Sequence, residues 1–244
     1  LSVTLLGVPA GATLSAGSRQ PDGSWQLAAA DLPNLRLTPP HDFAGTLDLT
    51  LRATSTETSN GVSATTEHAF TVQVAGVMDG ASLSASAAGR EDTAIPIRAE
   101  FGTSSDSSEV WDTVAVIRGV PAGAVLSQGT DLGHGAWQVD RAELAAGHVA
   151  VTPPANSSAP ISLRIEARLL DREDASASQL VSTTTTVQVT AVADAPAMQA
   201  AAAVGDEDTA IRLDLSAALT DTDGSEALSV TLLGVPAGAT LSAG

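Results

Sequence analysis

The residues of this sequence that could do chemistry are carboxylates gathered in short polar loops. Between positions 191 and 226, an Ala-Val-Ala-Asp-Ala-Pro segment is followed by Asp206-Glu207-Asp208 and then by the loop Asp221-Thr222-Asp223-Gly224-Ser225-Glu226. Calcium takes about 6 to 8 oxygen ligands at about 2.3 to 2.6 Å in flexible geometry, and carboxylates a few residues apart in turns supply such oxygens. This spacing predicts a calcium-stiffened joint between two β-domains.

The charge balance of the chain disfavours two classes of partner. Among its 244 residues 28 are acidic and 11 are basic, which gives a formal net charge of -17. Such a balance disfavours nucleic acid, because binding to nucleic acid depends on cationic side chains that neutralise phosphates. It also disfavours anionic membrane surfaces. No apolar run approaches the roughly 20 residues that a membrane-spanning helix needs.

Several kinds of reactive or stabilising group are missing from the sequence. There is no cysteine, so disulfides and thiolate metal sites are excluded, and bound metal ions are the physical substitute for such staples. Neither a nucleophile elbow nor a phosphate-binding glycine loop is found. The carboxylates recur at repeat boundaries instead of gathering in one pocket. We therefore expect no enzymatic activity.

Internal repetition is the strongest pattern in the chain. The segment LSVTLLGVPAGATLSAG occurs at 1–17 and again, without a change, at 228–244, and a diverged copy lies at 114–129. Each copy contains a GVPAGA segment, and the first glycines of these segments are Gly7, Gly119 and Gly234. One complete repeat therefore lies between two partial ones.

Within a repeat the local pattern is strand and turn. The segments 46–54 and 161–169 alternate apolar and polar residues, as half-buried strands do. The β-branched segments 67–74 and 182–190 are expected to be the last strand of each unit. Pro and Gly turns separate these strands, no stretch shows a capped helical period, and 27–32 is expected to form a single turn. Seven or so short strands in about 110 residues predict an all-β fold of antiparallel β-sandwiches.

The order of the short motifs resembles a known family. A repeat opens with Glu-Asp-Thr-Ala-Ile, at 91–95 and 207–211. The motifs that follow in a repeat are an Asp-Thr-Asp-Gly loop (221–224), a Pro-Pro turn (39–40 and 153–154), a Phe-Ala-Gly turn (43–45) and an Ala-Val-Ala-Asp-Ala-Pro linker (191–196). This order is similar to that of the cadherin-like extender repeats of giant bacterial surface adhesins of the RTX type, which are secreted through type I systems. The resemblance covers essentially the whole chain. It implies tandem immunoglobulin-like or cadherin-like domains, an extracellular place on the bacterial cell surface, and Ca²⁺ at each domain junction.

The resemblance also implies which carboxylates hold the ions. At the junction between the second and third units the implied ligands are Glu91, Asp92, Asp194, Asp221, Asp223 and Glu226. At the junction between the first and second units they are Asp79, Asp106 and Glu109, with Asp42 and Asp171 as further candidates. The acidic loop of the first junction has lost one aspartate, and its linker, 75–80, ends in Gly80, whereas the other linker, 191–196, ends in Pro196. We therefore expect the first junction to bind calcium more weakly, or to bend more, than the second.

Other interpretations of the same residues stay open. Acidic loops are commonly solvated turns, and the run 171–176 fits a solvated loop as well as a ligand donor. Trp25 and Trp137 recur at one repeat position and are expected to fill the sandwich cores rather than form a sugar-stacking platform, and the four histidines show no metal-ligand spacing. The alternative functions are a carbohydrate- or ligand-binding sandwich of a secreted protein and a spacer attached to a secreted hydrolase.

The division into repeats leads to expectations about partners. We place an incomplete sandwich without its first strands at 1–78, a complete one at 79–194 and the first strands of a third at 195–244. A sandwich without an edge strand recruits a matching strand, so the tail of one copy could complete the head of the next. A longer array of repeats explains the identical ends equally well. The expected partners are then neighbouring repeats of the same polypeptide, and the expected role is a spacer that projects a distal ligand-binding region.

Overall fold

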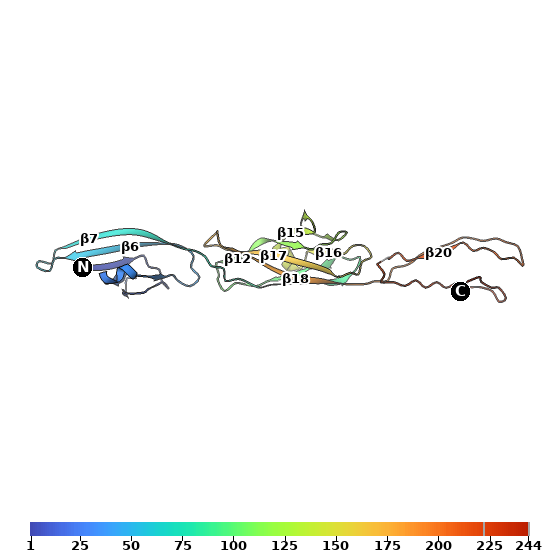
Figure 1. Ribbon diagram of the computed structural model, residues 1–244, viewed down its shortest axis with the longest axis horizontal. Coiled ribbons are helices and arrows are strands. Elements are labelled where there is room, and N and C mark those ends of the chain that lie inside the picture. Colours follow the sequence, from blue (N-terminus) through green and yellow to red (C-terminus); the bar gives the residue numbers. More distant parts are fainter. Residues whose placement is uncertain (222, 244) are drawn as a thin grey trace. The chain divides into compact units, whose positions relative to one another are not determined.

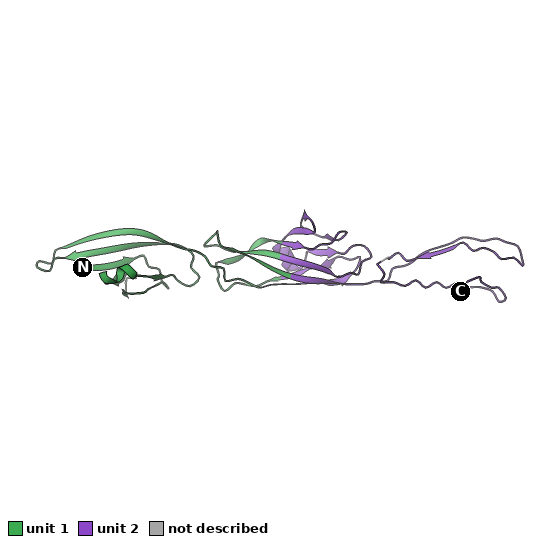
Figure 2. Cartoon of the chain, viewed as in Figure 1, with its two compact units in different colours: residues 1–83, 100–115, 166–183 green, residues 84–99, 116–165, 184–244 purple. Residues whose placement is uncertain are grey.

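Strands dominate the computed structural model, which describes residues 1–221 and 223–243 (Figure 1). Thr222 and Gly244 lie outside the described residues, and with them one position of the predicted acidic loop and the last position of the third predicted unit. The chain forms two compact units, one of residues 1–83, 100–115 and 166–183 and one of residues 84–99, 116–165 and 184–244 (Figure 2). These bounds do not coincide with the predicted repeat boundaries, which stay predictions.

The first repeat is built on a five-stranded antiparallel sheet in the order β3-β4-β1-β6-β7. Its strands are β1 (Ser2–Leu6), β3 (Ser18–Arg19), β4 (Trp25–Leu27), β6 (Gly45–Thr56) and β7 (Ser63–Val74). A second sheet pairs β2 (Thr13–Leu14) with β5 (Leu37–Thr38). In the larger sheet, Leu5 of β1 lies opposite Trp25 on one side and Leu51 on the other.

Alternating apolar side chains join these two sheets into a sandwich. Val3, Leu5 and Leu27 are buried in the five-stranded sheet, and Leu14 and Leu37 of the small sheet pack against the same cluster. Burying a side chain of this kind stabilises the fold by about 1.5–3 kcal/mol. The predicted antiparallel β-sandwich is confirmed.

The long hairpin of β6 and β7 carries the predicted strands 46–54 and 67–74. Its register places Gly45 opposite Val74 and Thr56 opposite Ser63. Polar pairs line its exposed part, including Arg52 Nε to Glu67 Oε1 at 2.6 Å. The single turn predicted at 27–32 is a 3₁₀ helix, Ala29–Asn34.

The second repeat contains three sheets. The largest has the strand order β14-β15-β12-β17-β18-β9, a smaller one has the order β10-β16-β13, and the third pairs β11 with β8. The strands are β8 (Leu83–Ser86), β9 (Ala88–Arg90), β10 (Ile95–Pro96), β11 (Arg98–Phe101), β12 (Glu109–Arg118), β13 (Val125–Leu126), β14 (Thr130–Gly133), β15 (Ala136–Asp140), β16 (Ala150–Thr152), β17 (Ile161–Asp171) and β18 (Ser178–Thr190). The predicted strands 161–169 and 182–190 fall within β17 and β18.

The expectation that no capped helix occurs is wrong. Helix α1 (Arg141–Ala146) follows β15, and Asp140 caps it by accepting hydrogen bonds from the amides of Ala142 and Glu143. Gly147 ends it in the left-handed conformation, with φ 78°. The local sequence contains these signals: an aspartate three residues before a glutamate, and a glycine after the last turn. The buried side chain of this six-residue helix is Leu144.

The last part of the chain contains an antiparallel pair of strands, β19 (Ala197–Ala200) and β20 (Leu215–Ala218). Residues 228–243, the described part of the second copy of residues 1–17, differ in structure from the first copy. Val3 and Leu5 in β1 are 2% and 3% exposed, whereas their counterparts Val230 and Leu232 are 61% and 44% exposed and belong to no strand. A strand is stabilised by its hydrogen-bonded and cross-strand neighbours, which β1 finds in β4 and β6.

Candidate metal sites

The tightest group of carboxylates in the described residues consists of Glu91, Asp221 and Asp223. One carboxylate oxygen from each lies within 4.8 Å of the others. Glu91 is 2% exposed and Asp221 is 1% exposed, while Asp223 is exposed. Three of the predicted ligands of the second junction are thus brought together from positions 130 residues apart in the chain.

Backbone groups fix Glu91 in two places, at its own amide and at its carboxylate. Its own amide donates to Thr190 O at 3.1 Å, next to the parallel pairing of β9 with β18. Its Oε1 accepts a hydrogen bond from the amide of Val192 at 2.5 Å. The other oxygen, Oε2, is buried and has no hydrogen-bond partner. A buried carboxylate oxygen without a partner is costly, and a cation would satisfy it.

The loop that follows β20 is shaped by its own carboxylates. Asp221 Oδ1 accepts from the amide of Asp223 at 2.8 Å, and Asp223 Oδ1 accepts from the amide of Ser225 at 2.7 Å. Asp223 Oδ2 accepts from both the amide and the hydroxyl of Ser158, at 3.0 and 2.9 Å. The Ser158 amide first, and then the Ser225 hydroxyl, hold the pKa of Asp223 well below its usual range, so this carboxylate is charged at neutral pH.

The other predicted ligands of this junction lie outside the three-carboxylate group. Glu226 accepts a hydrogen bond from the amide of Asp194, and its Oε2 is buried without a partner. Asp92 has a φ of 55°, and its Oδ1 accepts from the amide of Asn156 at 2.8 Å. Asp92 therefore connects two loops through a backbone amide.

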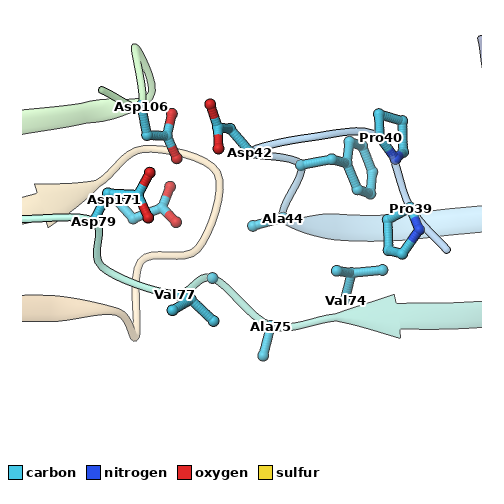
Figure 3. A pocket seen from close by; sticks show the side chains of 12 residues that line it. Pro39, Pro40, Asp42, Ala44, Val74, Ala75, Val77, Asp79, Asp106 and Asp171 are labelled. Carbon is cyan, nitrogen blue, oxygen red and sulfur yellow. The ribbon is translucent and has the colours of Figure 1, made fainter. Parts of the chain in front are cut away.

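The first junction has a carboxylate-lined cavity of about 230 Å³. Pro39, Pro40 and Phe43 form part of its wall, and four acidic side chains point toward one another there, namely Asp42, Asp79, Asp106 and Asp171 (Figure 3). Asp106 is 6% exposed and Asp171 is 4% exposed. Asp42 also pairs with His41, whose Nδ1 lies 2.6 Å from Asp42 Oδ1.

Glu109 contacts the linker of the first junction in the same way as Glu226 contacts the linker of the second. Its Oε1 accepts from the amide of Asp79 at 2.6 Å, and its Oε2 is buried without a partner. Asp79 in turn accepts from the Ser105 hydroxyl at 2.9 Å. The eleven candidate ligands are thus distributed over two loop clusters, and each cluster contains a buried glutamate with an unpartnered oxygen.

Two acidic side chains of the run 171–176 accept hydrogen bonds from distant backbone amides, a role that was not predicted from the sequence. Glu173 Oε2 accepts from the amide of Ala44 at 3.0 Å, and Asp174 Oδ2 accepts from the amide of Gly76 at 3.0 Å. Both carboxylates belong to the acidic run 171–176. Their acceptor role depends on long-range contacts with backbone amides, for which the local sequence has no pattern.

The tryptophans do not form an exposed platform in the part of the chain that the structure describes. Trp25 is buried in the core of the first sandwich, as predicted, whereas its counterpart Trp137 is half-buried. Trp111 packs edge-on against Phe101, with ring centroids 5.3 Å apart, and its indole N–H donates to Gly102 O.

Comparisons with known proteins give one distant structural likeness. No protein-family profile matches the sequence, and no curated protein matches it. Among solved structures, the ectodomain of human desmocollin-1 aligns over 80% of this chain and 36% of that chain, with 12% sequence identity and a TM-score of 0.30. Among the described residues, no helix has the length and apolar character needed to cross a bilayer. The fold assignment rests on the strand pairing of this chain.

Proposed function

We propose that this chain is part of the extender region of a large bacterial cell-surface adhesin. In this role its tandem β-sandwich repeats are a spacer that projects a distal ligand-binding region, and calcium at the repeat junctions makes the spacer rigid. The order of the repeat motifs supports the adhesin assignment. The acidic balance of the chain is consistent with calcium as the ligand.

The observation that carries the proposal is the environment of Glu91. This side chain is almost fully buried beside Asp221 and Asp223, and one of its oxygens has no hydrogen-bond donor. Two unit charges 4 Å apart repel by about 4 kcal/mol at an effective dielectric of about 20. A group of three carboxylates, two of them buried, is therefore unfavourable unless a cation neutralises it.

The mechanism is mechanical and uses residues on both sides of each linker. Glu91 precedes a linker that ends at Asp194 and Pro196, and Asp221 and Asp223 follow that linker. A bound calcium ion supplies the positive charge that allows these oxygens to approach one another. Glu91 and Glu226 are already oriented by the amides of Val192 and Asp194, so each presents a fixed oxygen.

Binding to the folded state also couples calcium to folding. A ligand at about 100 times its dissociation constant stabilises the folded state by about 2.7 kcal/mol for each site. A chain kept in low calcium before secretion would thus be easier to unfold, and it would become rigid outside the cell. Neighbouring repeats of the same polypeptide are the proposed partners. Head-to-tail strand complementation between copies stays a prediction, and the mass of the assembly in solution tests it.

The test is a calcium titration of the whole chain followed by small-angle X-ray scattering and thermal unfolding. We expect millimolar calcium, compared with chelator, to raise the melting temperature and to increase the maximum dimension of the particle. The double variant Asp194→Ala, Asp223→Ala should lose most of both responses. The control is Asp48→Asn, which removes an exposed charge from β6 and should respond like the natural sequence. If calcium changes neither quantity, the acidic loops are solvated turns, and a glycan array tests the ligand-binding alternative.

A further inference from the structure

The same backbone position is held by a carboxylate in both repeats. Ala44 and Ser158 each lie four residues after the second proline of a Pro-Pro turn. The amide of Ala44 donates to Glu173 Oε2 at 3.0 Å, and the amide of Ser158 donates to Asp223 Oδ2 at 3.0 Å. The donor position is thus equivalent in the two repeats, whereas the accepting carboxylates come from different loops.

The loop that contributes Glu173 has a fixed internal structure. Asp171 Oδ1 accepts from the amides of Glu173 and Asp174, at 2.7 and 3.2 Å. Asp174 Oδ1 accepts from the amide and the hydroxyl of Ser176, at 2.9 and 2.6 Å. The amide of Ala177 closes the turn on Asp174 O at 2.9 Å. These contacts orient Glu173 Oε2 and Asp174 Oδ2 toward the backbone of the first repeat.

The linker of the first repeat meets this loop at Gly76. Asp174 Oδ2 accepts from the Gly76 amide at 3.0 Å. A β-carbon at this position would overlap the Asp171 carboxylate and would lie 3.0 Å from the β-carbon of Asp174. The second linker has Ala191 at the equivalent place, two residues after its Val-Gln-Val strand end. The packing of the acidic loop against the first linker therefore requires glycine at position 76.

We propose that the loop Asp171–Ala177 is a docking surface for the preceding repeat, and that its two hydrogen bonds, Glu173 to the Ala44 amide and Asp174 to the Gly76 amide, hold the first junction closed without a metal ion. These two bonds are the carboxylate latch. The two acceptors, Glu173 and Asp174, lie outside the set of proposed cation ligands, whereas Asp171 of the same loop belongs to it.

The chemistry of the latch needs no cation. Hydrogen bonds from an amide to an ionised carboxylate are shorter and about twice as strong as neutral ones. Glu173 is exposed, which limits the strength of its single bond, and the second bond and the close packing at Gly76 add to it.

The second junction differs from the first because Asp223, the acceptor that corresponds to Glu173, has two roles. Asp223 accepts from Ser158 and is also one of the three carboxylates grouped with Glu91 and Asp221. Without a cation, the repulsion within that group opposes the same contact that Asp223 makes with Ser158. Resting here on the proposed calcium function, we infer that the second junction closes only with the ion, whereas at the first junction the latch bonds hold against the repulsion among Asp42, Asp79, Asp106 and Asp171.

The experiment measures hydrogen exchange of the assigned amides of Ala44, Gly76 and Ser158 by NMR in the whole chain, with chelator and with calcium. In chelator we expect Ala44 and Gly76 to be protected, whereas Ser158 should be protected only when calcium is present. Glu173→Ala should speed exchange at Ala44 by about tenfold, as loss of one bond to a charged group implies. Glu173→Gln retains an acceptor oxygen and should keep most of the protection, while Asp48→Asn should change nothing.

Gly76→Ala is a second, independent variant. It should speed exchange at both latch amides, Ala44 and position 76, because the new methyl group displaces the loop. A thermal melt should show that both sandwiches stay folded. Ala191→Gly in the other linker should leave Ser158 unaffected. Fast exchange at Ala44 and Gly76 in chelator would overturn the latch, and so would a Glu173→Ala chain with unchanged protection. If calcium fails to bind at all, only the expectation for Ser158 fails, so the two proposals are tested separately.

Discussion

The carboxylate of Glu109 accepts a hydrogen bond from the backbone amide of Asp79 at 2.6 Å, and Glu226 accepts one from the amide of Asp194 in the same way. In each pair the aspartate belongs to a linker and the glutamate follows an acidic loop. The second oxygen of each glutamate is buried without a donor. Each linker therefore orients one glutamate by its backbone and leaves one oxygen available for a cation.

Glu91→Gln should have opposite effects with and without calcium. In chelator the variant should melt at a higher temperature than the natural chain, because it removes one of three neighbouring negative charges. In calcium it should melt at a lower temperature and bind the ion about tenfold or more weakly, since an amide is a poorer ligand for a hard cation. Thermal melts and calorimetric titration measure both effects. The same sign of change in both conditions would contradict a cation at Glu91.

The two junctions should differ in calcium affinity. Glu91→Gln weakens the second site and Glu109→Gln weakens the first, so titration of the two variants reports mainly on the remaining site in each. We expect the weaker binding in the Glu91→Gln chain, because the loop of the first junction has Ser104 where that of the second has Asp221. Equal dissociation constants in the two variants would show that the additional cavity carboxylates, Asp42 and Asp171, compensate for this loss.

Gly7→Ala and Gly234→Ala make a matched pair within one repeated segment. Both glycines have a positive φ, 84° and 79°, so alanine is strained at each. At Gly7 the added carbon would also overlap the carbonyl oxygen of Asp48, whereas nothing lies within 4 Å at Gly234. Gly7→Ala should destabilise the first sandwich by about 2 kcal/mol or more, and Gly234→Ala should leave that sandwich unchanged. Urea unfolding curves of the two variants compare them directly.

Asp22 should make the first sandwich sensitive to acid. Its Oδ1 accepts from the hydroxyl and the amide of Ser24, at 2.7 and 3.0 Å, and these bonds, the hydroxyl first, lower its pKa. A carboxylate with a lowered folded pKa contributes stability that is present above its unfolded pKa of about 3.9 and is lost as the pH falls through the folded value. Asp22→Asn should therefore reduce the loss of melting temperature between pH 5 and pH 3. An unchanged pH profile would show that the Ser24 contacts do not persist in solution.

Much of the fold followed from local patterns in the sequence. The strands at 46–54 and 161–169 were predicted because their side chains alternate between a buried and an exposed face, and a period of two is visible in any one strand. The loop Asp221–Glu226 was predicted for a similar reason, since its carboxylates are spaced for a turn. The missed helix α1 shows the limit of periodicity, because six residues are too few for a helical period and only the caps at Asp140 and Gly147 mark it.

The contacts across the junctions could not be predicted in this way. Glu173 reaches Ala44 over 129 positions, and its partner is a backbone amide, which every residue except proline possesses. The need for glycine at position 76 is likewise visible only once the loop Asp171–Ala177 is placed against it. The sequence predicted a set of candidate ligands, and the fold shows which carboxylates accept hydrogen bonds from distant backbone amides.

The two copies of the segment LSVTLLGVPAGATLSAG also differ as antigens. In the first copy Val3, Leu5 and Val8 face the core, whereas residues 228–243 of the second copy are exposed along their whole length. An antibody raised against the free peptide would bind the folded 244-residue chain through its second copy. Additional binding at the first copy would then report that β1 has left its sheet. One reagent could thus follow the unfolding of the first sandwich, with a built-in reference in the same molecule.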